Sequence, residues 1–214
     1  MKTVVRGTSV PPGALIAPTL MLTGRSAAVV YAQPAAELSR LAKAGAIVKL
    51  ARGYYAAVPV DKRGTDWMPS VEDIAVGIAT AVYGPDRGAA WGLSAARVHG
   101  ALPRAIATGF VLGPTQHRPV ALTARSGHIE FRKRDPDRLD LELIVTTVGP
   151  GLVTTVEQTI LDLNAREFDR DDLRAEAVRT LMARADHAKL EDLAERTRGH
   201  AALRRVRRLI ADAD

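Results

Sequence analysis

PAAELSRLAKAGAIVKLARGYYAAVP, residues 34–59, begins with the pattern of a short amphipathic helix. Leu38, Leu41 and Ala42 fall at i, i+3 and i+4, so they form one apolar stripe on a helix. Pro34 suits the first helical turn, because the N–H that proline lacks would have no partner there. The spacing therefore predicts a helix that begins at Pro34 and buries one narrow face.

A small hairpin is predicted to follow this helix. Gly45 suits the helix end, because a left-handed residue costs glycine little. Residues 47–50 and 54–58 favour two strands joined by a turn at 51–53. A polar, basic helix followed by a basic hairpin is the arrangement with which a winged helix-turn-helix contacts DNA, although a solvated helix face carries similar residues. The polar residues left outside the apolar stripe and on the hairpin are Glu37, Ser39, Arg40, Lys43, Lys49 and Arg52.

The charge of the chain is concentrated in its first third. Residues 1–64 hold nine Lys and Arg against two acids, a net charge of +7. The remaining residues hold 21 bases and 22 acids, a net charge of −1. A solvated surface has no reason to separate charge in this way, whereas a unit that binds phosphates does. The first third is therefore predicted to bind nucleic acid.

The overall composition is that of an ordinary folded protein, with 47% hydrophobic and 25% charged residues. The chain has no cysteine, which excludes disulfides and thiolate metal sites and fits a reducing cytoplasm. An apolar run at 14–22 resembles a secretory signal, but Pro18 interrupts it and no clean small-residue cleavage site follows. We expect a helix over residues 10–24, a short helix capped by Ser26, and no membrane span.

Two domains are predicted. The polar segment 59–66 is interpreted as a linker between a winged helix-turn-helix domain, residues 1–64, and a mixed α/β domain ending in helices, residues 65–214. The predicted fold class is therefore α+β, with two units that we expect to fold separately. The second unit is predicted to hold a helix between Ser70 and Gly84, a helix at 95–99, strands at 109–112, 119–124, 128–133 and 139–147, a helix capped by Thr154 and Thr155, and two or three helices within 169–212.

Asp140 and Glu142 are two acids on one predicted strand, as in a restriction-type nuclease. That nuclease core places a lysine two residues after the second acid, and this chain has Ile144 there. The alternation with Leu141 and Leu143 instead predicts that the two acids lie on an outer, solvated face of the strand. We therefore do not expect a nuclease active site here.

The other titratable residues have patterns typical of structural roles. His99 precedes a glycine at a helix end, where capping or packing is commoner than catalysis, and the five histidines show no zinc-ligand spacing. Asp162 is expected to be hydrogen-bonded or ion-paired. Two basic clusters favour a solvated face, with a second DNA contact or an acidic partner as the alternative: Arg132-Lys133-Arg134, and Arg204, Arg205, Arg207 and Arg208.

Three segments together resemble AbiEi-type antitoxins. RLAKAGAIVKLARGYYAAV, residues 40–58, resembles the winged-helix signature of that family. WGLSAARVHGAL, residues 91–102, resembles its Ser-Ala-rich helix ending in His-Gly-Leu. VTTVEQTILDL, residues 153–163, resembles its Thr-capped helix with an Asp before the last leucine. The three matches occur in the order of the family, whereas the proline-rich N-terminus departs from it.

This resemblance implies a bacterial antitoxin without enzymatic activity, metal or cofactor. Its first domain would bind double-stranded DNA at inverted repeats of its own promoter, and its second would neutralise a nucleotidyltransferase-like toxin. A cytoplasmic protein that is monomeric in solution and binds DNA cooperatively is compatible with this role. The alternatives are a winged-helix protein with a C-terminal nuclease activity, and a purely protein-binding antitoxin without operator binding.

Roles in DNA binding can be assigned within the first domain. Ser39, Arg40 and Lys43 are expected to face the bases of the major groove, where Glu37 would accept from a cytosine amino group. Phosphate contacts are expected from Lys49 and Arg52 on the hairpin and from Lys2, Arg25 and Ser26.

Overall fold

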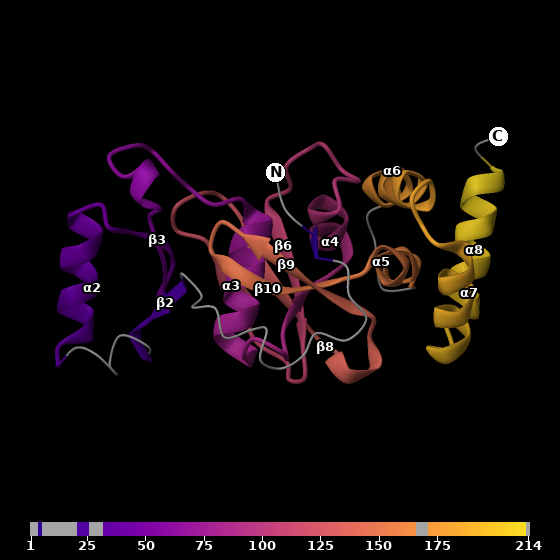
Figure 1. Cartoon of the computed structure of the whole chain (residues 1–214), viewed down its shortest axis with the longest axis horizontal. Coiled ribbons are helices and arrows are strands. Elements are labelled where there is room, and N and C mark those ends of the chain that lie inside the picture. Colours follow the sequence, from indigo (N-terminus) through magenta and orange to yellow (C-terminus); the bar gives the residue numbers. More distant parts are fainter. Residues whose placement is uncertain (1–3, 6–20, 26–31, 166–170, 213–214) are drawn as a thin grey trace.

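A computed structural model describes residues 4–5, 21–25, 32–165 and 171–212. The described chain is a mixed α+β fold, as predicted, arranged in layers along its longest axis (Figure 1). From one end, the layers are helix α2 (Pro34–Lys43), a three-stranded sheet, helix α3 (Val71–Tyr83), a seven-stranded sheet and a group of helices.

The three-stranded sheet is antiparallel with the order β2-β4-β3, formed by β2 (Met21–Thr23), β4 (Tyr54–Ala57) and β3 (Ile47–Ala51). The predicted helix after Pro34 and the predicted hairpin are confirmed. The helix predicted over residues 10–24 is wrong at Met21–Thr23, where the chain pairs with β4 and buries Met21 in the core. The rest of that prediction, and Ser26, lie outside the described residues.

Helix α3 is buried almost all round because it lies between the two sheets. The predicted stripe was one-sided, yet every residue from Val71 to Thr80 is buried. The Ser70 hydroxyl caps the helix by accepting from the Asp73 N–H at 3.1 Å, as predicted. At Gly77 a Cβ would lie 2.6 Å from Met21 Cγ and 2.9 Å from Val148 Cγ2, so only glycine fits without movement of its neighbours.

The seven-stranded sheet has the order β1-β9-β10-β5-β6-β8-β7. The pairs β10–β5 and β6–β8 are parallel and the other neighbours are antiparallel. Three predicted strands are confirmed, whereas the fourth, 119–124, shortens to two residues and β10 was not predicted at all. The strands are β1 (Val4–Val5), β5 (Ala89–Ala90), β6 (Thr108–Gly113), β7 (Val120–Ala121), β8 (His128–Lys133), β9 (Leu141–Thr146) and β10 (Gly149–Thr154).

The faces of β9 are opposite to those predicted. Glu142 and Ile144 are buried, whereas Leu141 and Leu143 are only partly buried and Val145 is 50% exposed. The buried side faces the cluster that joins α3, α4 and β10. The prediction failed because alternation separates two faces of a strand but does not show which of them a helix covers.

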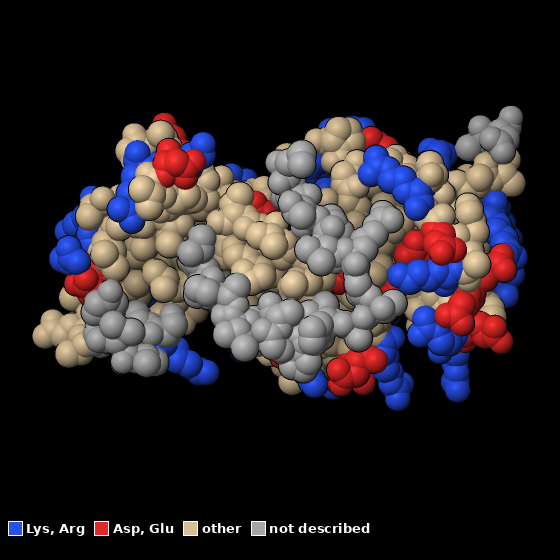
Figure 2. Space-filling view, in the orientation of Figure 1, with Lys and Arg blue, Asp and Glu red and all other residues tan. Residues whose placement is uncertain are grey.

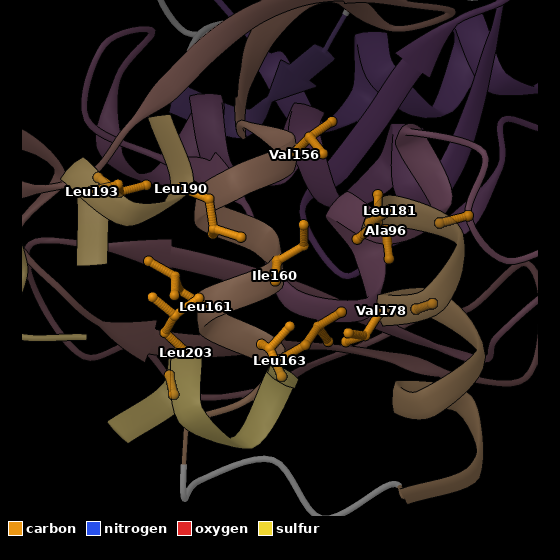
Figure 3. Close-up of a cluster of buried hydrophobic side chains, with 14 of the residues drawn as sticks. Ala96, Val156, Ile160, Leu161, Leu163, Val178, Leu181, Leu190, Leu193 and Leu203 are labelled. Carbon is orange, nitrogen blue, oxygen red and sulfur yellow. The ribbon is translucent and has the colours of Figure 1, made fainter. Parts of the chain in front are cut away.

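At the helical end of the molecule, the other helices pack around α5 (Val156–Leu163). The Thr155 hydroxyl caps α5 by accepting from the Gln158 N–H, as predicted. Ile160 and Leu163 are fully buried against the neighbouring helices (Figure 3). Three helices occupy the C-terminal region, in agreement with the prediction. The elements are α4 (Gly92–Val98), α6 (Asp171–Met182), α7 (His187–Arg196) and α8 (His200–Ala211), with short 3₁₀ turns at Val60–Lys62 and Pro136–Arg138.

The small sheet and the second predicted domain share one apolar cluster. Leu50 and Ala56 of the hairpin pack with Ile74 and Ile78 of α3 and with residues of the large sheet. The segment after β7 lies alongside the edge strand β3, where the Thr123 N–H donates to the Leu50 carbonyl at 2.9 Å. The segment 59–66, predicted as a linker, therefore joins two units whose cores are continuous.

Among the described residues, no helix is both long enough and apolar enough to span a membrane.

Candidate nucleic-acid interface

Helix α2 carries the predicted polar face outward. Leu38 is buried, and Leu41 packs with it against Ile47 of the small sheet. Ser39 and Lys43 are exposed on the other side of the helix. Gly45 has φ of +67°, which allows the sharp turn from the helix into β3. The helix is thus fixed to the sheet by a narrow apolar stripe while its polar face stays accessible.

Glu37 and Arg40 are paired with each other on this face. Arg40 donates from Nη2 to Glu37 Oε1 at 2.6 Å and from Nε to Glu37 Oε2 at 3.0 Å. The hydrogen bond from Arg40 lowers the pKa of the Glu37 carboxyl below its usual value. Exposed pairs contribute little to stability, so an incoming ligand can replace this one at small cost. The roles expected for these two residues both require the pair to open.

The hairpin places two more basic residues beside α2. Side chains alternate along a strand, so Lys49 lies on the same side of β3 as Ile47, which packs against α2. Because Lys49 is exposed, it lies beside the helix rather than beneath it. Arg52 is exposed at the hairpin turn, next to Gly53 with φ of +85°.

Arg25 lies at the same end of the small sheet as Arg52. Strand β2 ends at Thr23, which is paired with Tyr54, the first residue after the hairpin turn. Arg25 follows two residues later and is exposed. Ser26, the remaining predicted contact, is outside the described part of the chain, as is Lys2.

One basic residue near the hairpin comes from the second predicted domain. Leu122 forms a bridge with Ala51 and Thr123 binds Leu50, so the turn that contains exposed Arg125 lies against strand β3. This neighbour could not be predicted from the sequence, because about seventy residues separate Arg125 from the hairpin and no local pattern links them.

The basic residues collect at the end of the molecule formed by α2, where Figure 2 shows blue surface over that helix and the adjoining segments. Within the described residues, Lys43, Lys49 and Arg52 take part in no ion pair. An anionic ligand would therefore meet cations that are not already neutralised. All seven Lys and Arg described between residues 21 and 64 are exposed: Arg25, Arg40, Lys43, Lys49, Arg52, Lys62 and Arg63.

Glu142 of β9 and Asp140, which precedes this strand, are both engaged with neighbouring residues. Lys189 Nζ lies 2.6 Å from Asp140 Oδ2. Burial lowers the pKa of Lys189, but the carboxylates of Asp140 and Glu157 outweigh it and raise that pKa overall. Glu142 Oε1 lies 3.6 Å from His99 Nδ1, and Nε2 of the same ring donates to the Thr154 carbonyl at 2.7 Å. The prediction that Glu142 is solvated is therefore wrong.

Other buried charges link elements of the second domain. Arg97 of α4 donates to Glu72 of α3 at 2.6 Å. Asp162 accepts from Arg134 at 2.5 Å and from Gln158 at 2.8 Å, which confirms its predicted pairing. Among the residues that the structure describes, no group of three His, Cys, Asp or Glu could hold a metal ion.

No protein-family model matches the chain, and a search of curated proteins finds no match.

Proposed function

We propose that the protein is a DNA-binding regulator whose N-terminal unit is a winged helix. The proposal rests chiefly on one arrangement: a helix with an exposed basic face packs on a small antiparallel sheet whose hairpin is also basic. In a winged helix, a recognition helix lies in the major groove while the hairpin contacts the backbone. The order β2-β4-β3, with α2 before β3, supports this assignment.

The proposed contacts divide into two kinds. Arg40 and Lys43 on α2, together with Ser39, would face base edges. Lys49 and Arg52 would bind phosphates, which fixes the position of the protein without reading sequence. Arg125, in the turn that follows the segment paired with β3, would add a further phosphate contact from the second domain.

We also propose, from the resemblance to AbiEi-type antitoxins, that the DNA is the promoter of the protein's own operon and that the partner is a nucleotidyltransferase-like toxin. In this proposal the surface of the second domain neutralises the toxin and the protein is not itself an enzyme. The two engaged acids support this over a nuclease, because Asp140 is paired with Lys189 and Glu142 is buried.

Fluorescence anisotropy with the full chain and its own upstream DNA tests the proposal. Arg40→Ala should lower affinity for the operator by about 1–3 kcal/mol and relax sequence preference, if Arg40 binds a guanine. Arg52→Ala should weaken all sequences alike and reduce the slope of log affinity against log salt by about one unit.

Arg138→Ala is the matched control, because Arg138 is 86% exposed on the second domain and should not touch DNA. Loss of binding that is equal in Arg40→Ala and Arg138→Ala would contradict the assigned interface. Salt-independent, negligible binding of the wild-type chain would favour the purely protein-binding antitoxin.

A further inference from the structure

A second basic site lies at the other end of the molecule from α2. A pocket of about 320 Å³ opens where α6 and α8 meet the end of α5. Leu163 of α5, Val178 of α6 and Leu203 of α8 pack in the apolar cluster that holds these three helices together (Figure 3). The pocket is lined by Asn164, Arg174, Ala175, Arg179, Arg205, Arg208, Leu209 and Asp212.

Four guanidinium groups line this pocket against one carboxylate, that of Asp212. Within the described part of the chain, neither Arg179 nor Arg208 forms an ion pair. Two nearby arginines outside the pocket are paired, because Arg207 binds Glu191 at 2.6 Å and Arg196 binds Asp192 at 2.8 Å. Arg179 and Arg208 therefore leave positive charge uncompensated at a concave part of the surface.

Asn164 adds a buried hydrogen-bond acceptor to the same pocket. Its side chain is fully buried, and Nδ2 donates to the Ile160 carbonyl at 2.9 Å. Its Oδ1 has no hydrogen-bond partner among the described residues. The Asn164 carbonyl accepts from Arg205 Nε at 2.6 Å, which holds that guanidinium at the pocket. Buried polar atoms are nearly always hydrogen-bonded in folded proteins, so the Asn164 Oδ1 acceptor is left for a donor from outside the described chain.

We propose that this pocket binds a nucleotide. Guanidinium groups match phosphate oxygens in pairs, so Arg179 and Arg208, with Arg205, would hold the phosphates. A hydroxyl or amino group of the same molecule would donate to Asn164 Oδ1. The volume of the pocket is within the range of small-molecule sites. The phosphate and its neighbouring donor can belong to a free nucleotide or to the end of a nucleic-acid strand.

Isothermal titration calorimetry of the full chain with ATP, inorganic pyrophosphate, and an oligonucleotide with or without a 5′-phosphate tests this site. ATP should bind, and Arg208→Ala and Arg179→Ala should each weaken binding about tenfold or more. Arg207→Ala is the control, because Arg207 is on the same helix but is paired with Glu191 outside the pocket. Stronger binding of the 5′-phosphorylated oligonucleotide than of ATP, with the same dependence on Arg208, would identify the strand end as the source.

Asn164→Ala tests the second half of the proposal. Pyrophosphate has no sugar or base, so ATP should bind more tightly than pyrophosphate to the wild type, and this preference should disappear in the variant. Circular dichroism verifies that Asn164→Ala is folded. If this variant does not fold, the exposed-site variants Arg179→Ala and Arg208→Ala still test the phosphate half of the site.

Two results would overturn the nucleotide site: no binding of ATP at millimolar concentration, or equal weakening by Arg207→Ala and Arg208→Ala. The outcome is independent of the proposed operator binding. The triple variant Arg40→Ala, Lys49→Ala, Arg52→Ala should lose DNA affinity and keep ATP binding.

Discussion

Leu50→Ala tests whether the N-terminal unit, for which DNA binding is proposed, and the second domain unfold together. Leu50 lies on β3, is fully buried, and packs in the cluster that α3 and the large sheet share. Removing a buried leucine side chain to alanine costs about 2–5 kcal/mol. For a chain of this length each kcal/mol lowers Tm by about 2–4 °C, so we expect a decrease of roughly 4–20 °C.

Trp91 reports the unfolding of a distant part of the molecule. It is buried in a separate cluster formed with Leu112 and Leu152, and Trp67→Phe leaves it as the only tryptophan, because the chain has two. If the continuous core makes one cooperative unit, Trp91 fluorescence and far-UV circular dichroism should give one shared midpoint. Leu50→Ala should move that midpoint for both signals.

Val60→Ala is the control for Leu50→Ala. Val60 is 77% exposed on the same N-terminal unit, so its loss should change stability by no more than about 0.5 kcal/mol. The reasoning fails if Leu50→Ala produces two transitions and the Trp91 midpoint stays at its original temperature. That result would mean that the small sheet unfolds alone, as the sequence predicted.

Three further predictions concern the second domain. Ser70→Ala removes the cap of α3 and should cost about 0.5–2 kcal/mol in urea denaturation. Lys189→Gln should destabilise the protein below pH 10.5, where the wild-type Lys189 is charged. The difference in stability from wild type should disappear as the pH rises through the raised pKa of Lys189, because the ammonium then loses its proton. Leu161→Asp places an unpaired charge in the helical cluster, costs roughly 3–5 kcal/mol, and should abolish both toxin rescue in co-expressing cells and operator binding in anisotropy assays.

Local patterns predicted the elements whose signals lie within a few residues. The helix after Pro34 and the hairpin follow from apolar spacing and a glycine, and the start of α5 follows from Thr155. These features depend on neighbouring residues, so no distant segment could change them. The exposure of Ser39 and Lys43 followed in the same way from the stripe that includes Leu38.

Features that depend on what covers an element could not be predicted. Glu142 was assigned to solvent because nothing in its strand shows that the buried face is the one with Ile144. Strand β2 was assigned to a helix because its partner, Tyr54–Ala57, lies about thirty residues away. The same limit applies to the sites, since Arg125 and the arginine pocket are brought into place by segments distant in the sequence.

The central position of α3 has a consequence for the proposed DNA recognition. Helix α2 is held by a cluster with only two buried apolar side chains among the described residues, Leu38 and Ile47. The sheet beneath it is held much more firmly, because Met21 and Leu50 enter the large cluster around α3. The hairpin is therefore the rigid part of the proposed interface and α2 the adjustable part. Phosphate contacts from the hairpin can then set the register, while small movements of α2, after the Glu37–Arg40 pair opens, fit Arg40 to the bases.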